Sequence, residues 1–182
     1  MSIQPDAVAK YVREHAQLGF SSRDGRLFPS AAARFEKAFS LLPGETLDLF
    51  LSGARSLSIQ IQTDPALPLG MRIESSGPAA ERAYTIVVYQ EHLGWPEDLF
   101  IGAFLRELGH VVAERPPERE WPTQRAERAQ FRENLENRAD AMVWRWGLKH
   151  YSIRHITATY PSHRVDEILA AIEHVLLGEC DA

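Results

Sequence analysis

Three residues of one predicted helix have the types and spacing of a metal site. Arg106, Glu107 and His110 lie in the segment LRELGH, so their side chains share one helix face. In the pattern H-E-x-x-H, two histidines bind a metal ion and the glutamate activates water. Here Arg106 occupies the first histidine position, and its protonated guanidinium has no lone pair for a metal. The function therefore depends on whether the chain keeps a metal site or only its scaffold.

A second predicted helix carries a stripe of acids. Glu133, Glu136 and Asp140 recur at steps of three and four residues. Acids stacked in this way repel one another unless cations or a metal offset them. The alternative is a solvated helix surface on which arginines of the same helix pair with the acids; these arginines are Arg125, Arg128, Arg132 and Arg138. Taken alone, the stripe fits the solvated surface better.

Composition and charge exclude several classes of protein. The 182-residue chain is 45% hydrophobic and 25% charged, which is ordinary for a soluble globular protein. Its formal net charge of −5 gives no electrostatic reason to expect nucleic-acid binding. The N-terminus lacks the features of a signal peptide, and no apolar run reaches the roughly 20 residues of a membrane span. The one cysteine, Cys180, fits a reducing compartment. We therefore expect a cytoplasmic protein with no membrane or nucleic-acid partner.

The elements that must position these residues can be predicted from apolar spacing and turn signals. The pattern predicts helices at about 5–19, 30–42, 47–51, 96–113, 123–146 and 164–177. It predicts strands at 57–62 and 84–89, with a third at 71–75. We expect a single α+β domain, 1–182, in which a helical N-terminal part (1–52) precedes a part with the sheet and motif helices (53–182).

The helix at 96–113 is apolar almost all round its axis. We expect such a helix to be buried, with its polar strip facing a cleft, a metal or partner charges. Gly109 removes a side chain at a point where another element can approach closely. The alternative is that Arg106 and Glu107 form a solvated edge and that His110 is a hydrogen-bonded packing residue.

The two helices and the strand before them resemble a known arrangement. A strand at 84–89, a helix with E-L-G-H and a helix with E-x-x-A-D are similar to the zincin metallopeptidases of the glutamate-ligand branch. The similarity covers about residues 84–147. It implies an α+β fold in which a small, mostly antiparallel sheet packs against the motif helix and the long second helix, with the N-terminal helices added.

The resemblance also implies roles for individual residues. Glu107 matches the general base, His110 the second metal ligand and Glu136 the third. Asp140 matches the acid that orients a histidine ligand. Arg106 stands where the first ligand is expected, so the motif is degenerate. A catalytic zinc normally has three protein ligands and a water molecule, and only two of those ligands are left here.

A guanidinium at the metal position opposes metal binding. Two unit charges about 4 Å apart repel by about 4 kcal/mol at an effective dielectric of about 20, and a divalent ion roughly doubles this energy. We therefore predict that Arg106 itself supplies the positive charge, between Glu136 and either Glu107 or Asp140, in a buried ion pair. On this hypothesis the protein needs no cofactor; the alternative cofactor is zinc.

The favoured functional hypothesis is a zincin-like protein without catalytic activity, a pseudoenzyme that acts in binding or regulation. Its partner would be a peptide or protein segment in the cleft. We expect that segment to extend along an edge strand that contains Val87, Val88 and Tyr89.

Two other hypotheses stay open at this point. One is an active metal-dependent hydrolase or peptidase that uses His110, Glu136 and a further ligand, namely His92, Asp140 or Glu133. The other is a structural or assembly domain in which the motif is a coincidence. Tryptophans would then serve as surface anchors, with core packing as their alternative role; they are Trp95, Trp121, Trp144 and Trp146.

Overall fold

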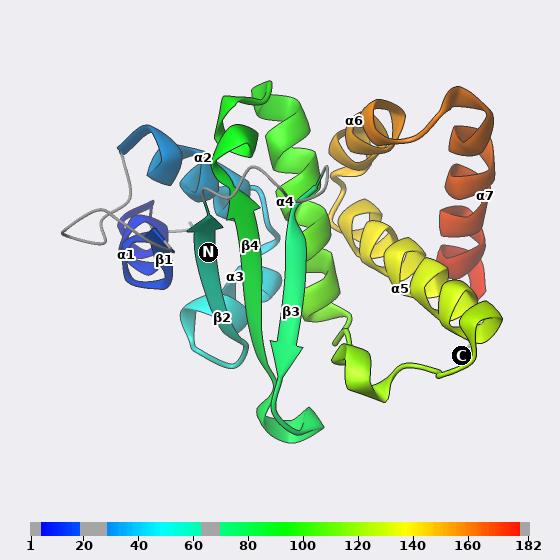
Figure 1. The fold of residues 1–182 in the computed structure, drawn as a ribbon. Helices are drawn as coiled ribbons and strands as arrows, with labels where there is room; N and C mark the ends of the chain where they lie inside the picture. The colour runs from blue at the N-terminus through cyan, green and yellow to red at the C-terminus, as the bar shows by residue number, and fades with distance from the viewer. Residues whose placement is uncertain (1–4, 19–28, 63–69, 179–182) are drawn as a thin grey trace.

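A small mixed sheet lies at the centre of the structure (Figure 1). The structure is a computed structural model and describes residues 5–18, 29–62 and 70–178. Within these residues, four strands lie in the order β1-β2-β4-β3; they are β1 (Ala16–Leu18), β2 (Ser56–Gln62), β3 (Arg72–Ser76) and β4 (Ala83–Tyr89). Strands β1, β2 and β4 are parallel, and β3 runs antiparallel to β4 at one edge.

The α+β class is as predicted, but the prediction of a mostly antiparallel sheet is wrong. Of the three strand pairings, two are parallel. Two helices lie in the chain between β1 and β2, and a crossover of this kind returns the next strand in the same direction. Strand β3 comes between β2 and β4 in sequence, so two reversals leave β4 parallel to β2. Alternating polarity indicates which face of a strand is buried and does not indicate the direction of its neighbour.

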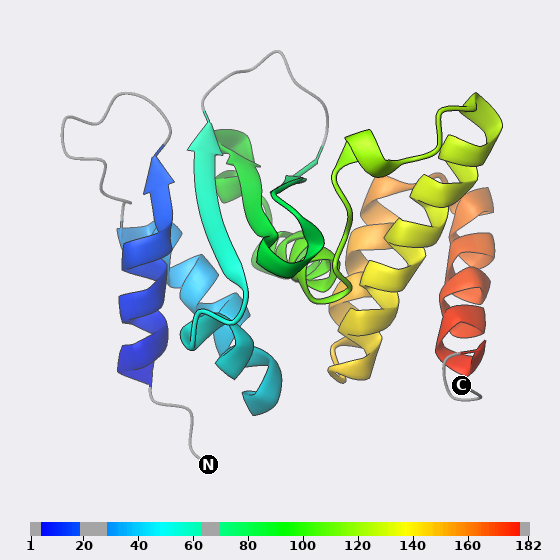
Figure 2. The ribbon, with the colours of Figure 1, turned by 90° about the horizontal axis from the view of Figure 1, so that it is seen from below.

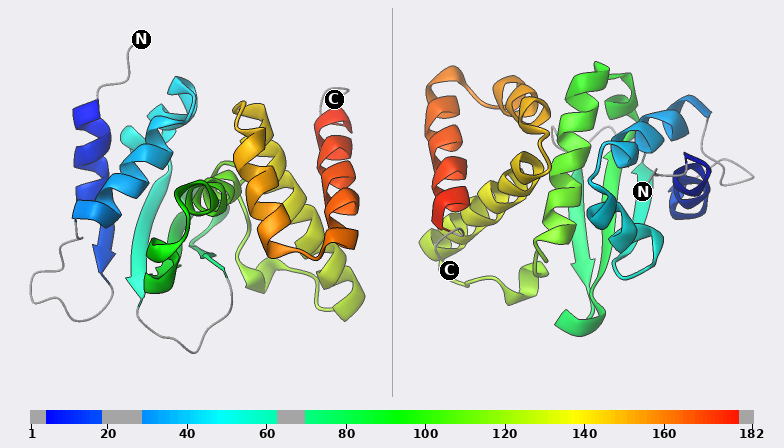
Figure 3. Two further views of the ribbon diagram at one scale, coloured as in Figure 1. Left: turned by 90° about the horizontal axis from the view of Figure 1, so that it is seen from above. Right: turned by 180° about the vertical axis from the view of Figure 1, so that it is seen from behind.

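Helices cover one face of the sheet and extend beyond one of its edges. The α-helices of the described residues are α1 (Pro5–His15), α2 (Pro29–Ser40), α3 (Gly44–Leu51), α4 (Glu97–Val112), α5 (Arg125–Arg145), α6 (Lys149–Thr159) and α7 (Ser162–Gly178). Helices α2, α3 and α4 lie against the same face, as the view from behind shows (Figure 3). Helices α5, α6 and α7 form a group on the β3 side of the sheet (Figure 2).

Two apolar clusters correspond to this arrangement. The larger one joins the sheet to α1, α2, α3 and α4, with Phe35, Ile86 and Phe104 fully buried in it. The smaller one joins α5, α6 and α7 through Trp144, Ile156 and other apolar side chains. Helix α4 stands between the two groups, because it packs on the sheet and also contacts α5 and α6. Every residue from Phe100 to Val111 is accordingly buried, as the sequence predicted.

Two helix predictions need correction. The first helix ends at His15 rather than near Gly19, because Ala16–Leu18 pairs with the free edge of β2 and tertiary hydrogen bonding overrides helix propensity. Helix α6 was not predicted. It begins after Leu148 without a side-chain cap and has weak apolar periodicity, so the sequence lacks the usual signals of a helix start.

Of the two roles considered for the tryptophans, core packing describes those that are buried. Trp121 and Trp144 are buried, and Trp95 and Trp146 are partly buried and pack against the larger apolar cluster. No helix in the described ranges is long and apolar enough to cross a bilayer. Cys180 lies outside the described residues.

Two glycines allow α4 to approach its neighbours closely. A Cβ atom added to Gly109 would lie 2.4 Å from the carbonyl oxygen of Ala139 on α5. A Cβ atom added to Gly102 would lie 2.3 Å from the carbonyl oxygen of Tyr151 on α6. The predicted close approach at Gly109 is therefore confirmed, and it brings the polar strip of α4 against the acids of α5.

We expect Gly109→Ala to lower the free energy of unfolding by about 2 kcal/mol, because the new methyl group meets rigid backbone. Gly44→Ala is the matched control: this glycine begins α3 with open space around it, so alanine should be neutral or slightly stabilising. Urea unfolding of both variants measures the difference. Equal midpoints for the two variants would show that α4 and α5 are not in close contact at Gly109.

Candidate functional site

The polar strip of α4 faces a cavity of about 820 Å³, which we call the cleft. One wall is Met71 and the start of β3, at Arg72 and Ile73, and the base includes Arg106 and Glu107 of α4. The opposite wall is the face of α5 that carries the acid stripe, and residues of α6, of α7 and of the turn between them also line the cleft. The cleft therefore lies between the edge of the sheet and the second group of helices (Figure 1).

The buried ion pair predicted for Arg106 is confirmed. Its Nη2 atom lies 2.7 Å from Oε2 of Glu136, and its Nε atom lies 3.0 Å from Oδ2 of Asp140. The guanidinium thus lies between two carboxylates of α5, one helical turn apart. Of the two acids predicted as the second partner, the structure selects Asp140; Glu107 has no direct contact with Arg106 among the interactions of the described residues.

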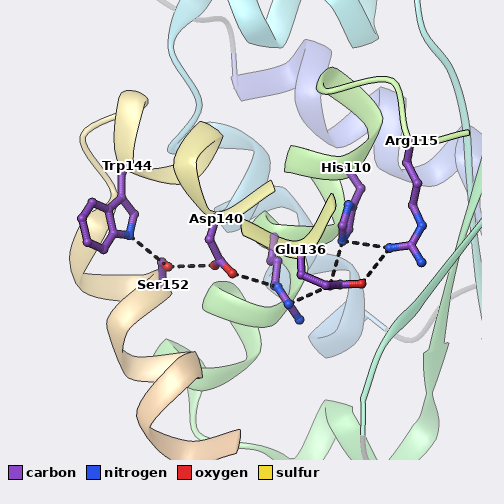
Figure 4. A network of polar contacts seen from close by, with 7 residues as sticks. His110, Arg115, Glu136, Asp140, Trp144 and Ser152 are labelled. Atoms are coloured by element: carbon purple, nitrogen blue, oxygen red, sulfur yellow. Dashed lines mark hydrogen bonds and ion pairs between the residues drawn. The ribbon is translucent and has the colours of Figure 1, made fainter. Parts of the chain in front are cut away.

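Glu136 is the centre of the cluster, because three nitrogen-bearing side chains contact its carboxylate. Besides Arg106, its Oε1 atom lies 3.0 Å from Nη1 of Arg115, and its Oε2 atom lies 3.1 Å from Nε2 of His110. The same Nη1 atom of Arg115 lies 3.1 Å from His110 Nε2. Two guanidinium groups therefore bracket the carboxylate that the family resemblance assigns to a metal (Figure 4).

The sequence analysis did not identify Arg115, and its position depends on how α4 ends. After the C-cap Ala113, Glu114 adopts a left-handed backbone with φ 58°. The N–H of Arg115 bonds to the carbonyl of His110, and the N–H of Glu114 to that of Val111. This is the Schellman pattern, which folds the chain back over the last helical turn. The sequence signal would have been a glycine at position 114, and the chain has glutamate there instead.

The other end of the network anchors Asp140. Ser152 of α6 donates from Oγ to Asp140 Oδ1 at 2.8 Å, and its oxygen accepts from Trp144 Nε1 at 3.1 Å. The chain of contacts from Trp144 to Arg115 thus joins α4, α5 and α6 (Figure 4). The unpredicted helix α6 is required for this arrangement, because it supplies Ser152. The same-helix arginine pairing considered for the acid stripe is not what neutralises Glu136 and Asp140, since their cations come from α4 and from the turn after it.

The cations around Glu136 outweigh its burial. Although burial alone would raise the pKa of this carboxyl, Arg106, His110 and Arg115 hold it well below its usual value. For Arg106, burial alone would lower the pKa, but Glu136 and Asp140 raise it instead. Both partners of the central pair are therefore charged across the physiological pH range.

Glu107 has the opposite electrostatic situation. Burial, followed by the nearby Glu136 charge, raises its pKa to about 8, although Arg106 and Arg115 act in the other direction. Its side chain lines the cleft, where a bound molecule can reach it. A carboxyl that keeps its proton at neutral pH donates a hydrogen bond and cannot accept a proton from water. Glu107 is therefore poorly prepared for the general-base role that the resemblance implies.

His110 is neutral, and its Nε2 atom is already in contact with two neighbouring side chains. Burial lowers its pKa to about 4, so the ring is neutral. Its Nδ1 atom is buried without a partner among the described residues, and its Nε2 atom lies 3.1 Å from both Glu136 Oε2 and Arg115 Nη1. With the hydrogen on Nε2 the ring donates to the carboxylate, and with it on Nδ1 the ring accepts from the guanidinium. With Arg115 beside it, the donor set does not fit a zinc ion.

The further ligands of the hydrolase hypothesis are engaged in other contacts. Asp140 lies in the same network as Glu136, but its two oxygens contact Arg106 and Ser152. His92 is buried away from the cleft, where its Nδ1 atom accepts from the backbone N–H of Tyr89 and its ring contacts Trp95. Glu133 pairs with Arg164 near the surface. In the parts of the chain that the structure describes, no group of three or more His, Cys, Asp or Glu side chains is placed to hold a metal ion.

The strand predicted to form the edge of the sheet is not an edge strand but the neighbour of one. Val87, Val88 and Tyr89 belong to β4, which pairs with β2 on one side and β3 on the other. The edge beside the cleft is β3, whose residues Arg72 and Ile73 line it. The hairpin from β3 to β4 places the earlier strand outside, and nothing in the alternation of β4 indicates on which side its neighbours lie. Tyr89 still lines the cleft, although not as part of an open edge.

Comparisons with known proteins found no relative of this chain. No protein-family model matches the chain, and neither a curated protein nor a solved structure matches it. The zincin-like family therefore stays a proposal that depends on the residues and their positions.

We expect that two substitutions are needed to create a zinc site. Arg106→His alone should bind zinc weakly, because Arg115 still contacts His110 and Glu136. The double variant Arg106→His/Arg115→Ala should bind more than tenfold more tightly, since one cation near a dication costs several kcal/mol. Arg106→Ala/Arg115→Ala is the control that removes both charges without adding a ligand. Mass spectrometry of bound metal after dialysis measures uptake, and equal affinities for the single and double histidine variants would contradict the role given to Arg115.

We expect stability to be greatest near pH 6.5. Above that pH, folded Glu107 (pKa about 8) keeps a proton that the unfolded chain has released, so stability falls as pH rises toward 8. Below it, buried His110 and His155, with pKa values of about 4 and 3, stay neutral while the unfolded chain binds protons, so stability falls as pH drops.

Glu107→Gln should remove the alkaline part of this profile, a loss on the order of 1–2 kcal/mol between pH 6.5 and 8. The exposed Glu127→Gln should leave the profile unchanged. Urea unfolding at a series of pH values measures both variants. An unchanged alkaline slope in Glu107→Gln would show that this carboxyl is not the group responsible.

Proposed function

We propose that the chain is a zincin-like domain without metallopeptidase chemistry that binds a peptide or protein segment in the cleft. The observation that supports this proposal most directly is that Arg106 and Arg115 both form ion pairs with Glu136. Two built-in cations occupy the surroundings of the carboxylate that would otherwise bind a metal. This network joins α4 to α5 and so supports the shape of the cleft.

The boundary of the cleft supports a peptide as its occupant. Strand β3 is at the end of the sheet order, so its outer backbone groups have no strand partner among the described residues. An extended peptide can add to such an edge through main-chain hydrogen bonds, while its side chains occupy the neighbouring space. Because Met71, Arg72 and Ile73 line the cleft, a peptide added to β3 would place alternate side chains in it.

We expect immobilised protein to retain members of a random library of end-capped peptides of about eight residues, enough to cover β3. Ala129→Trp should abolish retention, because Ala129 is an exposed residue of α5 that lines the cleft and a large ring there fills it. Ala126→Trp is the matched control, exposed on the same helix but outside the cleft. Bound peptide should also slow amide exchange at residues 72–76.

Three results would contradict the proposal. They are failure to retain any peptide, equal retention by the two tryptophan variants, and unchanged exchange at β3. Mass spectrometry of the retained peptides after incubation with zinc tests the loss of chemistry separately, since cleaved peptides would show that the protein is an active peptidase.

A further inference from the structure

The lining of the cleft has an excess of positive charge, although the chain as a whole carries −5. Seven arginines and five acidic residues line it. At the base, Arg106 and Arg115 are matched by Glu136 and Asp140. The excess therefore belongs to the outer part of the cleft, which is closer to solvent.

Two of the lining arginines have no ion-pair partner within the described ranges, whereas Arg72 pairs with Glu74 of its own strand. At the outer part of the cleft, Arg128 pairs with Glu118 and Arg164 with Glu133. Arg125 and Arg132 are exposed on α5 and have no ion-pair partner among the described residues. They lie seven positions apart on the helix, so both face the cleft and are separated by about 10.5 Å along its axis.

The placement of these arginines is unfavourable for the helix itself. Arg125 is the first residue of α5 and Arg128 is in its first turn, where the positive end of the helix dipole repels cations. The N-cap residue, Gln124, makes no side-chain cap, so the first N–H groups also lack a partner from this source. An anion at this end of the cleft would offset the repulsion between the arginines and the helix dipole, and it would accept hydrogen bonds from the free N–H groups.

We infer that the segment bound in the cleft is acidic, with carboxylate side chains that pair with Arg125 and Arg132. This inference rests on the proposed function, because it concerns the same cleft and the same edge strand. In an extended peptide, side chains two and four residues apart lie on one face, about 7 and 13 Å from each other. Two such carboxylates can reach both arginines while the backbone of the peptide pairs with β3.

A nucleic acid would also present negative charge, but the open strand edge favours a peptide. Main-chain hydrogen bonding to β3 needs a partner with alternating N–H and C=O groups, which a phosphate backbone does not have. The negative net charge of the whole protein also opposes a long polyanion.

The test compares acidic and neutral peptides on a pair of matched variants. The probes are two fluorescein-labelled, end-capped peptide pools of about eight residues, with glutamate fixed at two positions two residues apart or glutamine fixed at the same positions. Arg125→Gln/Arg132→Gln removes two charges from the cleft. Arg13→Gln/Arg138→Gln removes two charges from exposed residues outside it and is the control.

We expect the wild-type protein to bind the glutamate pool more tightly than the glutamine pool, with an affinity that falls as salt is added. The cleft variant should weaken binding of the glutamate pool about fivefold, while the control variant should not, because two exposed ion pairs contribute about 1 kcal/mol together. Anisotropy titrations measure these affinities.

Each other outcome overturns a distinct statement. Equal binding of both pools, abolished by Ala129→Trp, would leave peptide binding in place and overturn the acidic preference. Binding of neither pool would overturn the proposed function and this inference with it. Tighter binding of a single-stranded DNA of about ten nucleotides than of the glutamate pool, lost in the cleft variant, would replace the peptide by a nucleic acid.

Discussion

The ion pair between Arg106 and Glu136 is the interaction on which the rest of the site depends. It lies where α4 and α5 cross, and it is extended by Arg115 on one side and by Asp140 and Ser152 on the other. A buried pair of this kind gives little net stability compared with apolar residues of the same size, but loss of one partner typically costs about 3–5 kcal/mol. Its main effect is therefore to fix which faces of the helices meet. The shape of the cleft follows from that choice.

A cation supplied by a side chain differs from a bound metal in what it permits. A metal ion exchanges its ligands, polarises water and can leave, whereas a guanidinium is tethered to the backbone and offers only N–H groups in one plane. The Glu136 carboxylate already contacts nitrogen atoms of Arg106, His110 and Arg115. Such a centre is suited to holding a surface in one shape, which is the requirement for recognition rather than for hydrolysis.

Spacing along a single helix was enough to predict part of the site. The sequence did not predict the residues that reach the site only because a turn, a strand or another helix brings them back to it. Arg106 among retained acids indicated an ion pair, because its charge had to be matched in a buried helix. Arg115 was missed since a turn through Glu114, with a backbone usually formed by glycine, brings it back to His110. The edge of the sheet was misplaced because β3 lies outside β4, which no local pattern reveals. Ser152 was missed together with the helix that carries it.

The glycine contacts of α4 have a mechanical consequence. At Gly109 and Gly102 the backbones of α5 and α6 approach α4 so closely that no side chain separates them. Opening the α4–α5 side of the cleft would therefore break a close backbone contact. The opposite wall is a single strand held on one side by β4. A bulky occupant is then accommodated more easily by bending of β3 and its hairpin. The part of the cleft that deforms most easily is therefore the strand that the occupant would join.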